Sequence, residues 1–326
     1  MLRARRLAAA GSAAAAAGGA WLYLPGLETS FGPPRALQPQ KPLHSSLNAK
    51  EWVSEDTVRL RFALPSSEHV LGLPVPGHLM VVDAATNYRP YSPISIDRTA
   101  SGFFELLVRH YPHGEFSSQL ARMEVGDQAT FMGPVASRFE YTRETTRHMG
   151  LIAVGTGITP MWQVIQEALA DPSDTTRLSL VYASRAADNI LLKAEIDEAV
   201  AANPGRLSVS YLVSPPDAKR RRAAAPLPPG VRYGRIDESV LLAELPPPPD
   251  GSTIVTAERH GVGNDIDRPA CQLLVSGPET MLRELCGPRA RDGGVSAGPA
   301  AAQAKHPALG GTLRKLGYRS NQVSWL

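Results

Sequence analysis

The chain of 326 residues carries 34 basic and 31 acidic side chains, a net charge of +3, and 43% hydrophobic residues. This length predicts two globular domains rather than one, and the near balance of charge argues against nucleic acid as the partner. Two cysteines, Cys271 and Cys286, are too few for a disulfide scaffold. The sequence has no CxxC or HExxH motif, so no metal site is predicted.

The N-terminal segment is basic and then uncharged. Three arginines precede residues 7–24, and the first acidic residue is Glu28. As a helix this run would be roughly 27 Å long, just short of a hydrocarbon core of about 30 Å. We expect residues 1–28 to be a mitochondrial targeting segment or N-terminal membrane anchor; a secretory signal or a disordered leader are the alternatives. Trp21 and Tyr23 suit a membrane interface and favour an anchor that is retained.

Short strands dominate the next part of the chain. Residues 29–42 are rich in proline and predict a linker. From 43 to 145, polar and apolar residues alternate in segments such as 57–62 and 104–109, with Gly and Pro between them. This pattern predicts an antiparallel β-barrel, interrupted by one short helix from Ser117 to Met123.

Strands alternate with helices in residues 146–326. The apolar strand segments are 149–154, 178–183, 207–213 and 272–275, and the helical ones are 161–170 and 194–201. This alternation predicts a doubly wound parallel sheet that binds ligands at the carboxyl ends of its strands. Three segments rich in Pro, Gly or Ala, near 214–230, 244–270 and 287–311, predict surface insertions. The basic run at 219–222 is expected to be an exposed loop, with a patch for nucleic acid or acidic lipid as the alternative.

The segment Arg89-Pro90-Tyr91-Ser92-Pro93 carries the first candidate site. An arginine offers a rigid fork of donors to a phosphate. A tyrosine ring can lie along a flat cofactor, and a serine hydroxyl can bond a heteroatom of its ring. The alternative is a turn at a strand edge with a surface arginine.

A second candidate is the start of the short helix, His113-Gly114-Glu115-Phe116-Ser117-Ser118. Free N–H groups and the positive end of the helix dipole favour a phosphate at such a position. Ser117 is expected to cap the helix and bind the phosphate; a plain serine N-cap is the alternative.

Two strand ends predict a dinucleotide site. Gly155-Thr156-Gly157-Ile158-Thr159-Pro160 lies between a strand and a helix, and so does Ser276-Gly277-Pro278-Glu279-Thr280-Met281. The glycines permit close approach of the backbone to a ligand, and the proline near a helix start lacks an N–H that would be unpaired there anyway. A complete GxGxxG is absent.

In their order and spacing these segments resemble the NADH–cytochrome b5 reductase group of the ferredoxin-reductase-like flavoproteins. That group carries RxY(S/T), a Gly-x-x-Ser phosphate loop, GGTGITP and CGPPxM, and the resemblance covers the chain from Leu43 onward. It implies a six-stranded FAD-binding barrel followed by an α/β domain for NADH. It also implies hydride transfer to FAD and single-electron transfer to a haem protein such as cytochrome b5.

The resemblance also implies roles for individual residues. Arg89 would pair with FAD phosphate, Tyr91 and Pro90 would contact the flavin, and Ser92 would bond its ring. The remaining cofactor contacts would come from Leu107, Arg109, Gly114, Phe116 and Ser117 for FAD, and from Gly155, Gly157, Thr159, Pro160, Gly277, Pro278 and Met281 for the dinucleotide. Ser92, Thr159 and Ser276 would lie nearest the hydride path.

Departures from the family pattern limit these expectations. Val154 replaces a glycine, Glu115 a lysine and Ser276 a cysteine, while Ser214 stands where NADH-selective members carry an aspartate. NADPH is therefore an alternative to NADH.

The departures also resemble a mitochondrial inner-membrane subgroup of FAD proteins, implicated in supplying reduced haem to the machinery that matures cytochrome c. A membrane-tethered assembly factor with structural FAD is thus the alternative to an enzyme, and a mitochondrial membrane, reached through the N-terminal segment, is the expected location.

Overall fold

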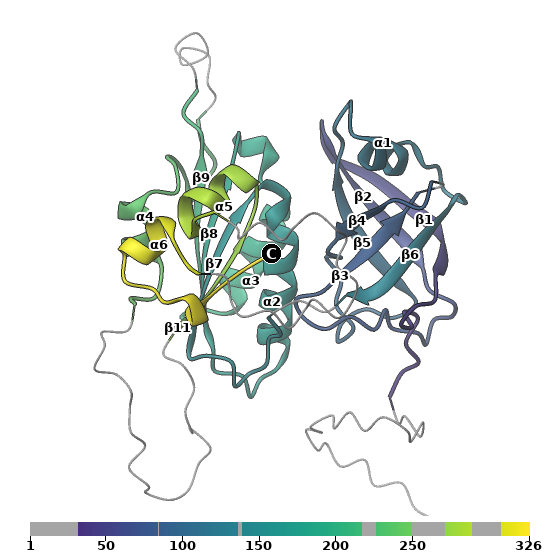
Figure 1. Ribbon diagram of the computed structural model, residues 1–326, viewed down its shortest axis with the longest axis horizontal. Helices are drawn as coiled ribbons and strands as arrows, with labels where there is room; N and C mark the ends of the chain where they lie inside the picture. Colours follow the sequence, from purple (N-terminus) through teal and green to yellow (C-terminus); the bar gives the residue numbers. More distant parts are fainter. Residues whose placement is uncertain (1–31, 84, 136–138, 217–225, 249–270, 289–307) are drawn as a thin grey trace, which may run out of the picture. The chain divides into compact units, whose positions relative to one another are not determined.

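The computed structural model describes residues 32–83, 85–135, 139–216, 226–248, 271–288 and 308–326 (Figure 1). The predicted N-terminal targeting or anchor segment, 1–28, lies outside the described residues, as do the larger parts of the last two predicted insertions. Among the described residues, no helix combines the length and the apolar character needed to cross a membrane.

The first domain is a six-stranded antiparallel sheet. Its strands are β1 (Leu43–Ser54), β2 (Thr57–Ala63), β3 (His78–Val82), β4 (Tyr88–Tyr91), β5 (Phe103–Arg109) and β6 (Gln128–Val135). They are ordered β4-β3-β6-β1-β2-β5, and every neighbouring pair is antiparallel. The predicted six-stranded antiparallel architecture is confirmed.

Alternation along the strands builds a single core within this sheet. Val58, Leu60 and Phe62 of β2 are fully buried, because every second side chain of a strand points to the same face. The rings of Phe62, Phe104 and Phe131 meet at centroid distances of 4.9–5.4 Å. Helix α1 (Glu115–Arg122) adds apolar side chains to the same core.

Part of the proline-rich segment packs on this domain. The backbone N–H groups of Ala36 and Leu37 donate to the carbonyls of Val70 and Leu71 at 2.9 and 3.0 Å. The Leu37 side chain is buried in the sheet's core. From residue 34 onward the segment that we expected to act as a linker is therefore held by backbone hydrogen bonds and apolar burial.

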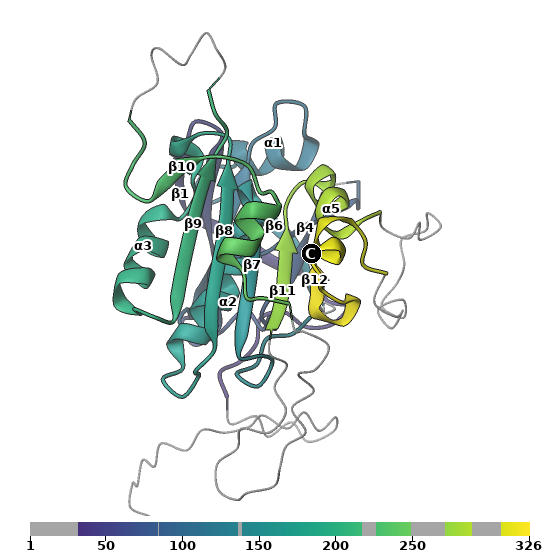
Figure 2. The ribbon, with the colours of Figure 1, turned by 90° about the vertical axis from the view of Figure 1, so that its left-hand side faces the viewer.

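The second domain is built on a parallel sheet, seen face-on in Figure 2. Its strands are β7 (His148–Val154), β8 (Arg177–Ser184), β9 (Leu207–Val213), β10 (Val231–Tyr233), β11 (Cys271–Ser276) and β12 (Val323–Trp325). The order β10-β9-β8-β7-β11-β12 is parallel throughout, which confirms the predicted doubly wound sheet. The strand order reverses between β7 and β11, and ligands bind at such a switch point in open α/β sheets.

Helices cover both faces of this sheet (Figure 1). One face is packed by α2 (Ile158–Ala170) and α3 (Lys193–Ala202), and the other by α4 (Glu238–Glu244), α5 (Glu279–Cys286) and α6 (Gly311–Lys315). Short 3₁₀ turns occupy Gly155–Gly157, Ala187–Asn189 and Ser320–Gln322. The core around α2 also includes Ile94, Leu107, Phe139 and Tyr141 from the preceding part of the chain. These four side chains therefore extend the core on the α2 face of the parallel sheet.

Candidate functional site

Two loops meet at the switch point of the parallel sheet. A Cβ atom on Gly157, after β7, would lie 2.3 Å from the carbonyl oxygen of Ser276, at the end of β11. No side chain fits at that distance, so glycine is required where the two loops touch. The structure thus brings the predicted Gly157 and Ser276 together across adjacent strand ends.

The loop after β11 also packs tightly against its neighbours. A Cβ atom on Gly277 would lie 2.9 Å from Cε of Met281 and 3.0 Å from Cβ of Val154. Ser276 is buried, whereas Pro278 is exposed and precedes the first turn of α5. Val154, which replaces a family glycine, therefore packs against this loop and narrows the space beside it.

Gly155 is held by a buried tyrosine. Its φ of +57° lies in the left-handed region that favours glycine. Its carbonyl accepts a hydrogen bond from the Tyr182 hydroxyl at 3.1 Å, and that hydroxyl in turn accepts one from the Leu191 N–H at 3.1 Å. Burial raises the pKa of Tyr182 to about 12, so the hydroxyl remains protonated and can donate. Tyr182 thereby fixes the turn that follows β7.

Arg109, at the end of β5, connects the first domain to this turn. Its Nη1 atom lies 3.7 Å from the Cβ position of Gly155, and its Nη2 atom forms an ion pair with Asp56. Burial raises the pKa of the Asp56 carboxyl, but hydrogen bonds from Thr57 and Arg109 outweigh it and hold that pKa below its usual value. The guanidinium also stands 5.9 Å from the ring centre of Tyr111. A fixed positive charge therefore lies beside the glycine turn.

Arg89 lies on β4, an edge strand of the first sheet. Its guanidinium donates to the Tyr88 carbonyl at 2.9 Å and stands 5.2 Å from the ring centre of Phe116 in α1. In the part of the chain that the structure describes, no carboxylate lies within 4 Å of Arg89. The structure therefore brings the first two predicted segments together, with a cation left available for a ligand.

Tyr91 and Ser92 follow at the end of β4. Tyr91 is half-buried; burial raises its pKa to about 12, against an opposing effect of Arg89. Ser92 is half-buried too, and its hydroxyl forms no hydrogen bond with the residues described. Pro90 is tolerated here because an edge strand does not need all of its N–H groups for the sheet.

Helix α1 begins two residues earlier than expected. It starts at Glu115 with Gly114 as N-cap, so the prediction that Ser117 caps it is wrong. The Ser117 hydroxyl is buried and accepts a hydrogen bond from the Tyr111 N–H at 3.1 Å, which closes the preceding turn. The first N–H groups of α1 lack acceptors within the helix and remain available to a ligand.

The remaining predicted residues lie in α2 and β5. Thr159 is buried and its hydroxyl donates to the Thr156 carbonyl at 3.1 Å. Pro160 is the third residue of α2, where an N–H would have no acceptor in the helix. Leu107 is buried in the core cluster that contains the α2 side chains and not in the first domain's own core.

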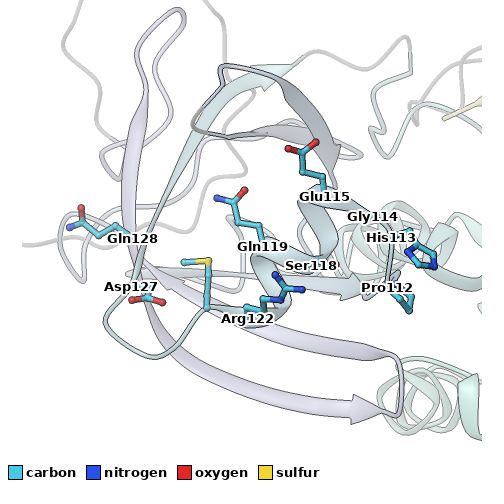
Figure 3. A pocket seen from close by; sticks show the side chains of 10 residues that line it. Pro112, His113, Gly114, Glu115, Ser118, Gln119, Arg122, Asp127 and Gln128 are labelled. Carbon is cyan, nitrogen blue, oxygen red and sulfur yellow. The ribbon is translucent and has the colours of Figure 1, made fainter.

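A separate hollow of about 740 Å³ borders the exposed side of α1. Figure 3 shows Glu115, Gln119 and Arg122 along that side of the helix. Of the predicted cofactor residues, Gly114 is the single one among its described lining residues. The hollow is therefore distinct from the glycine turns at the sheet's switch point. No group of three or more His, Cys, Asp or Glu side chains among the described residues is arranged to hold a metal ion.

Sequence reasoning missed four residues of this region. Asp56 and Tyr111 contact Arg109, Tyr182 holds Gly155, and Gln163 is buried in α2. Only Gln163 carried a signal in the sequence, because it is a polar residue one helical turn after Thr159 in an apolar helix. The other contacts arise from tertiary packing.

Comparison with known proteins gives two family matches. A model described as an oxidoreductase FAD-binding domain matches residues 44–141, and one described as an oxidoreductase NAD-binding domain matches residues 151–287. The first range contains the first sheet except its first residue, Leu43, and the second contains both glycine loops.

Similar proteins and a similar solved domain have also been found. An Arabidopsis thaliana NADH-cytochrome b5 reductase-like protein is 34% identical over 312 residues, which cover 93% of this chain and 82% of that protein. Candida glabrata NADH-cytochrome b5 reductase 1 is 37% identical over 171 residues, 52% of this chain and 60% of that protein, so the match spans less than two thirds of the yeast protein. The cytochrome b5 reductase domain of Ulva prolifera nitrate reductase superimposes with a TM-score of 0.62 and 28% identity, covering 76% of this chain and 92% of that one.

Proposed function

The chain belongs to the NADH-cytochrome b5 reductase family, and from that premise we propose that it oxidises NADH through bound FAD and delivers the electrons singly to a haem protein. The observation that carries this proposal is the contact between Gly157 and Ser276 at the switch point, with Arg109 beside it. A dinucleotide that binds there would approach the first domain, where Arg89 and α1 are adjacent.

The donor groups around β4 fit FAD. Arg89 is a cation without a carboxylate partner among the described residues, and the start of α1 offers free N–H groups nearby. These groups suit a pyrophosphate. The ring of Tyr91 and the unbonded hydroxyl of Ser92 suit a flat heteroaromatic ring. We assign FAD to this set, with Pro90, Gly114, Phe116 and Ser117 shaping the same surface.

The two glycine loops fit the nicotinamide dinucleotide. Side chains are excluded at Gly157, and at Gly277 a Cβ atom would already press on its neighbours, so the two loops lie close enough for one dinucleotide to contact both. We assign Gly155, Gly157, Thr159 and Pro160 to one wall of the dinucleotide site. Ser276, Gly277, Pro278 and Met281 form the other wall.

The protein's contribution to the reaction is positioning and electrostatics. Bound FAD would supply the conversion between a two-electron donor and one-electron acceptors. Tyr182 fixes the Gly155 carbonyl, and Asp56 orients the Arg109 guanidinium, so that the positive charge faces the glycine turn. Leu107 and the α2 side chains exclude water behind the site. None of the assigned residues has to act as a nucleophile or general base.

Stopped-flow reduction of the purified full chain tests this proposal. Protein loaded with FAD is mixed with NADH, and separately with NADPH, and the flavin absorbance near about 450 nm is followed. Rapid bleaching by NADH, followed by reoxidation by a haem protein, supports the proposal. Bound FAD that neither nicotinamide bleaches contradicts it and leaves the assembly-factor alternative. A folded protein that binds no FAD contradicts both.

The acceptor and the location follow as finer proposals. We propose cytochrome b5 or a haem protein of cytochrome c maturation as the acceptor, because both take single electrons. We also propose that the basic, acid-poor segment 1–28 directs the chain to a mitochondrial membrane. Reduction rates with each purified haem protein, and fractionation of cells that express the full chain, test the two proposals separately.

A further inference from the structure

One side chain of α2 is hydrogen-bonded to the first domain at two points. Gln163 is 1% exposed. Its Nε2 atom donates to the Pro93 carbonyl at 2.7 Å, and its Oε1 atom accepts from the Gly77 N–H at 2.8 Å. Both polar ends of the buried amide are therefore used, and each partner would be an unpaired buried backbone group without it.

These two backbone groups flank the segment assigned to the flavin. Pro93 directly follows Ser92, and Gly77 directly precedes β3, whose Leu79 pairs with Tyr91. Gly77 cannot carry a side chain, since a Cβ atom would lie 2.3 Å from the Pro74 carbonyl oxygen. Gln163 thus holds β3 and the end of β4 in one register relative to α2.

The same helix also forms one wall of the dinucleotide site. Gln163 lies one turn after Thr159, on the same face of α2, and the helix starts directly after Gly157. Further along this face, Gln166 donates to the Ile94 carbonyl at 2.7 Å, and Glu167 pairs with Arg98. A rigid α2 therefore spans from the glycine loop to the strand end at Ser92.

We propose that Gln163 is a positioning residue that sets the spacing between Ser92 and the glycine loop at Gly157. The inference rests on the proposed function, because this spacing matters only if hydride passes between ligands held on the two sides. A displacement of about 1 Å at such a distance can slow a reaction roughly 100-fold.

The variant Gln163→Glu tests this role with little change in volume. The introduced carboxyl group can still accept from Gly77, but when ionised it repels the Pro93 carbonyl. Burial raises the pKa of a carboxyl group, and its protonated form can donate to Pro93 again. We expect flavin reduction by NADH to be roughly 10- to 100-fold slower at about pH 8, and to recover toward the wild-type rate near about pH 6. The FAD content should equal that of the wild type.

Two further measurements do not depend on turnover. Hydrogen exchange at the peptide containing Gly77, and the visible circular dichroism of the bound flavin, should both change in Gln163→Glu and return at the lower pH. Glu167→Gln is the matched control, because it removes the charge from a contact of the same helix that is farther from Ser92 and partly exposed. It should change the rate of flavin reduction less than about 2-fold.

The outcomes separate this inference from the proposed function. Wild-type protein that fails to reduce FAD with NADH contradicts the proposed function. If the wild type is active and Gln163→Glu reduces its flavin at the wild-type rate at every pH, the proposed role of Gln163 is wrong. Gln163→Met, which removes both hydrogen bonds while keeping an apolar side chain of similar size, serves as the second variant. If both variants lose FAD and unfold, Gln163 is purely structural and the inference is wrong.

Discussion

The hydroxyl of Tyr182 donates to the carbonyl of Gly155 at 3.1 Å while it accepts from the Leu191 N–H at the same distance. One buried oxygen on β8 thus joins the turn after β7 to the segment before α3. The left-handed conformation of Gly155 is held by this bond rather than by the glycine loop alone.

Tyr182→Phe should therefore weaken binding of the dinucleotide. Loss of the hydroxyl leaves the buried Leu191 N–H unpaired, at a cost of roughly 1–3 kcal/mol in the free energy of unfolding. Because the Gly155 turn is freed, we also expect the dissociation constant for NADH to rise roughly 10-fold. Tyr211→Phe is the control: its hydroxyl bonds Asp197, so it should lose stability without a change in NADH affinity. Equal effects of the two variants on NADH binding would contradict this account.

Gly157→Ala should disrupt the meeting of the two loops. The added Cβ atom would lie 2.3 Å from the Ser276 carbonyl oxygen, so the backbone must move. Such overpacking should lower the free energy of unfolding by about 1–3 kcal/mol. We also expect NADH-dependent flavin reduction to be at least about 10-fold slower. Gly234→Ala adds the same atom at an ordinary distance of 3.4 Å from Leu212, and should alter neither property. Thermal unfolding and single-turnover kinetics measure both effects; a fully active Gly157→Ala would refute the close contact.

Arg89→Ala should lower FAD affinity with little loss of stability. The guanidinium has no carboxylate partner among the described residues, so its removal strands no buried charge. Charge-assisted hydrogen bonds to a phosphate contribute about 1.5–3 kcal/mol, which corresponds to a roughly 10- to 150-fold rise in the dissociation constant. Titration of the apoprotein with FAD, followed by flavin fluorescence, measures the change. Arg122→Ala, in the last turn of α1, should bind FAD like the wild type; a similar loss in both variants would remove Arg89 from the phosphate site.

Asp97 predicts a pH dependence of stability. Burial raises its pKa to about 6, although the Gly72 N–H donates to both carboxyl oxygens. Folded protein therefore binds a proton more readily than unfolded protein, whose aspartates titrate near 3.8. The contribution of Asp97 to stability is full below that value and falls as pH rises through about 6.

Asp97→Asn should remove this slope. Between about pH 4 and pH 7, the wild type should lose roughly 1–3 kcal/mol more of its free energy of unfolding than the variant does. Urea unfolding at a series of pH values gives the comparison. Asp83→Asn serves as the control, since hydrogen bonds from Asn87 lower the pKa of Asp83. A slope that persists in Asp97→Asn would show that another group causes it.

Local sequence pattern was sufficient for most of the fold. Alternation in 57–62 and 104–109 predicted β2 and β5, because every second side chain enters one core. The apolar segments that end in glycine predicted β7 and β11, and with them the edge of the sheet where the loops meet. These elements could be predicted because the burial pattern of a strand and the residues of its turn are both visible within a short segment of sequence.

Contacts made at a distance were not predictable in this way. Ser117 has the residue type of an N-cap, but its hydroxyl bonds the Tyr111 N–H, and the helix starts earlier, at Glu115. Likewise, nothing local to Gln163 indicated that its partners would be Gly77 and Pro93. Such pairings depend on how the two sheets dock. The residue pattern of a single segment contains no information about that docking.

The strand order also has a consequence for biosynthesis. Gly157 follows the first strand of the parallel sheet, whereas its neighbour Ser276 ends a strand that is synthesised far later and then inserts beside β7. When the FAD-binding part has been synthesised, one wall of the proposed dinucleotide site is still missing. Translation must therefore pass β11 before the proposed oxidation of NADH can begin, so that activity requires both domains to have been made.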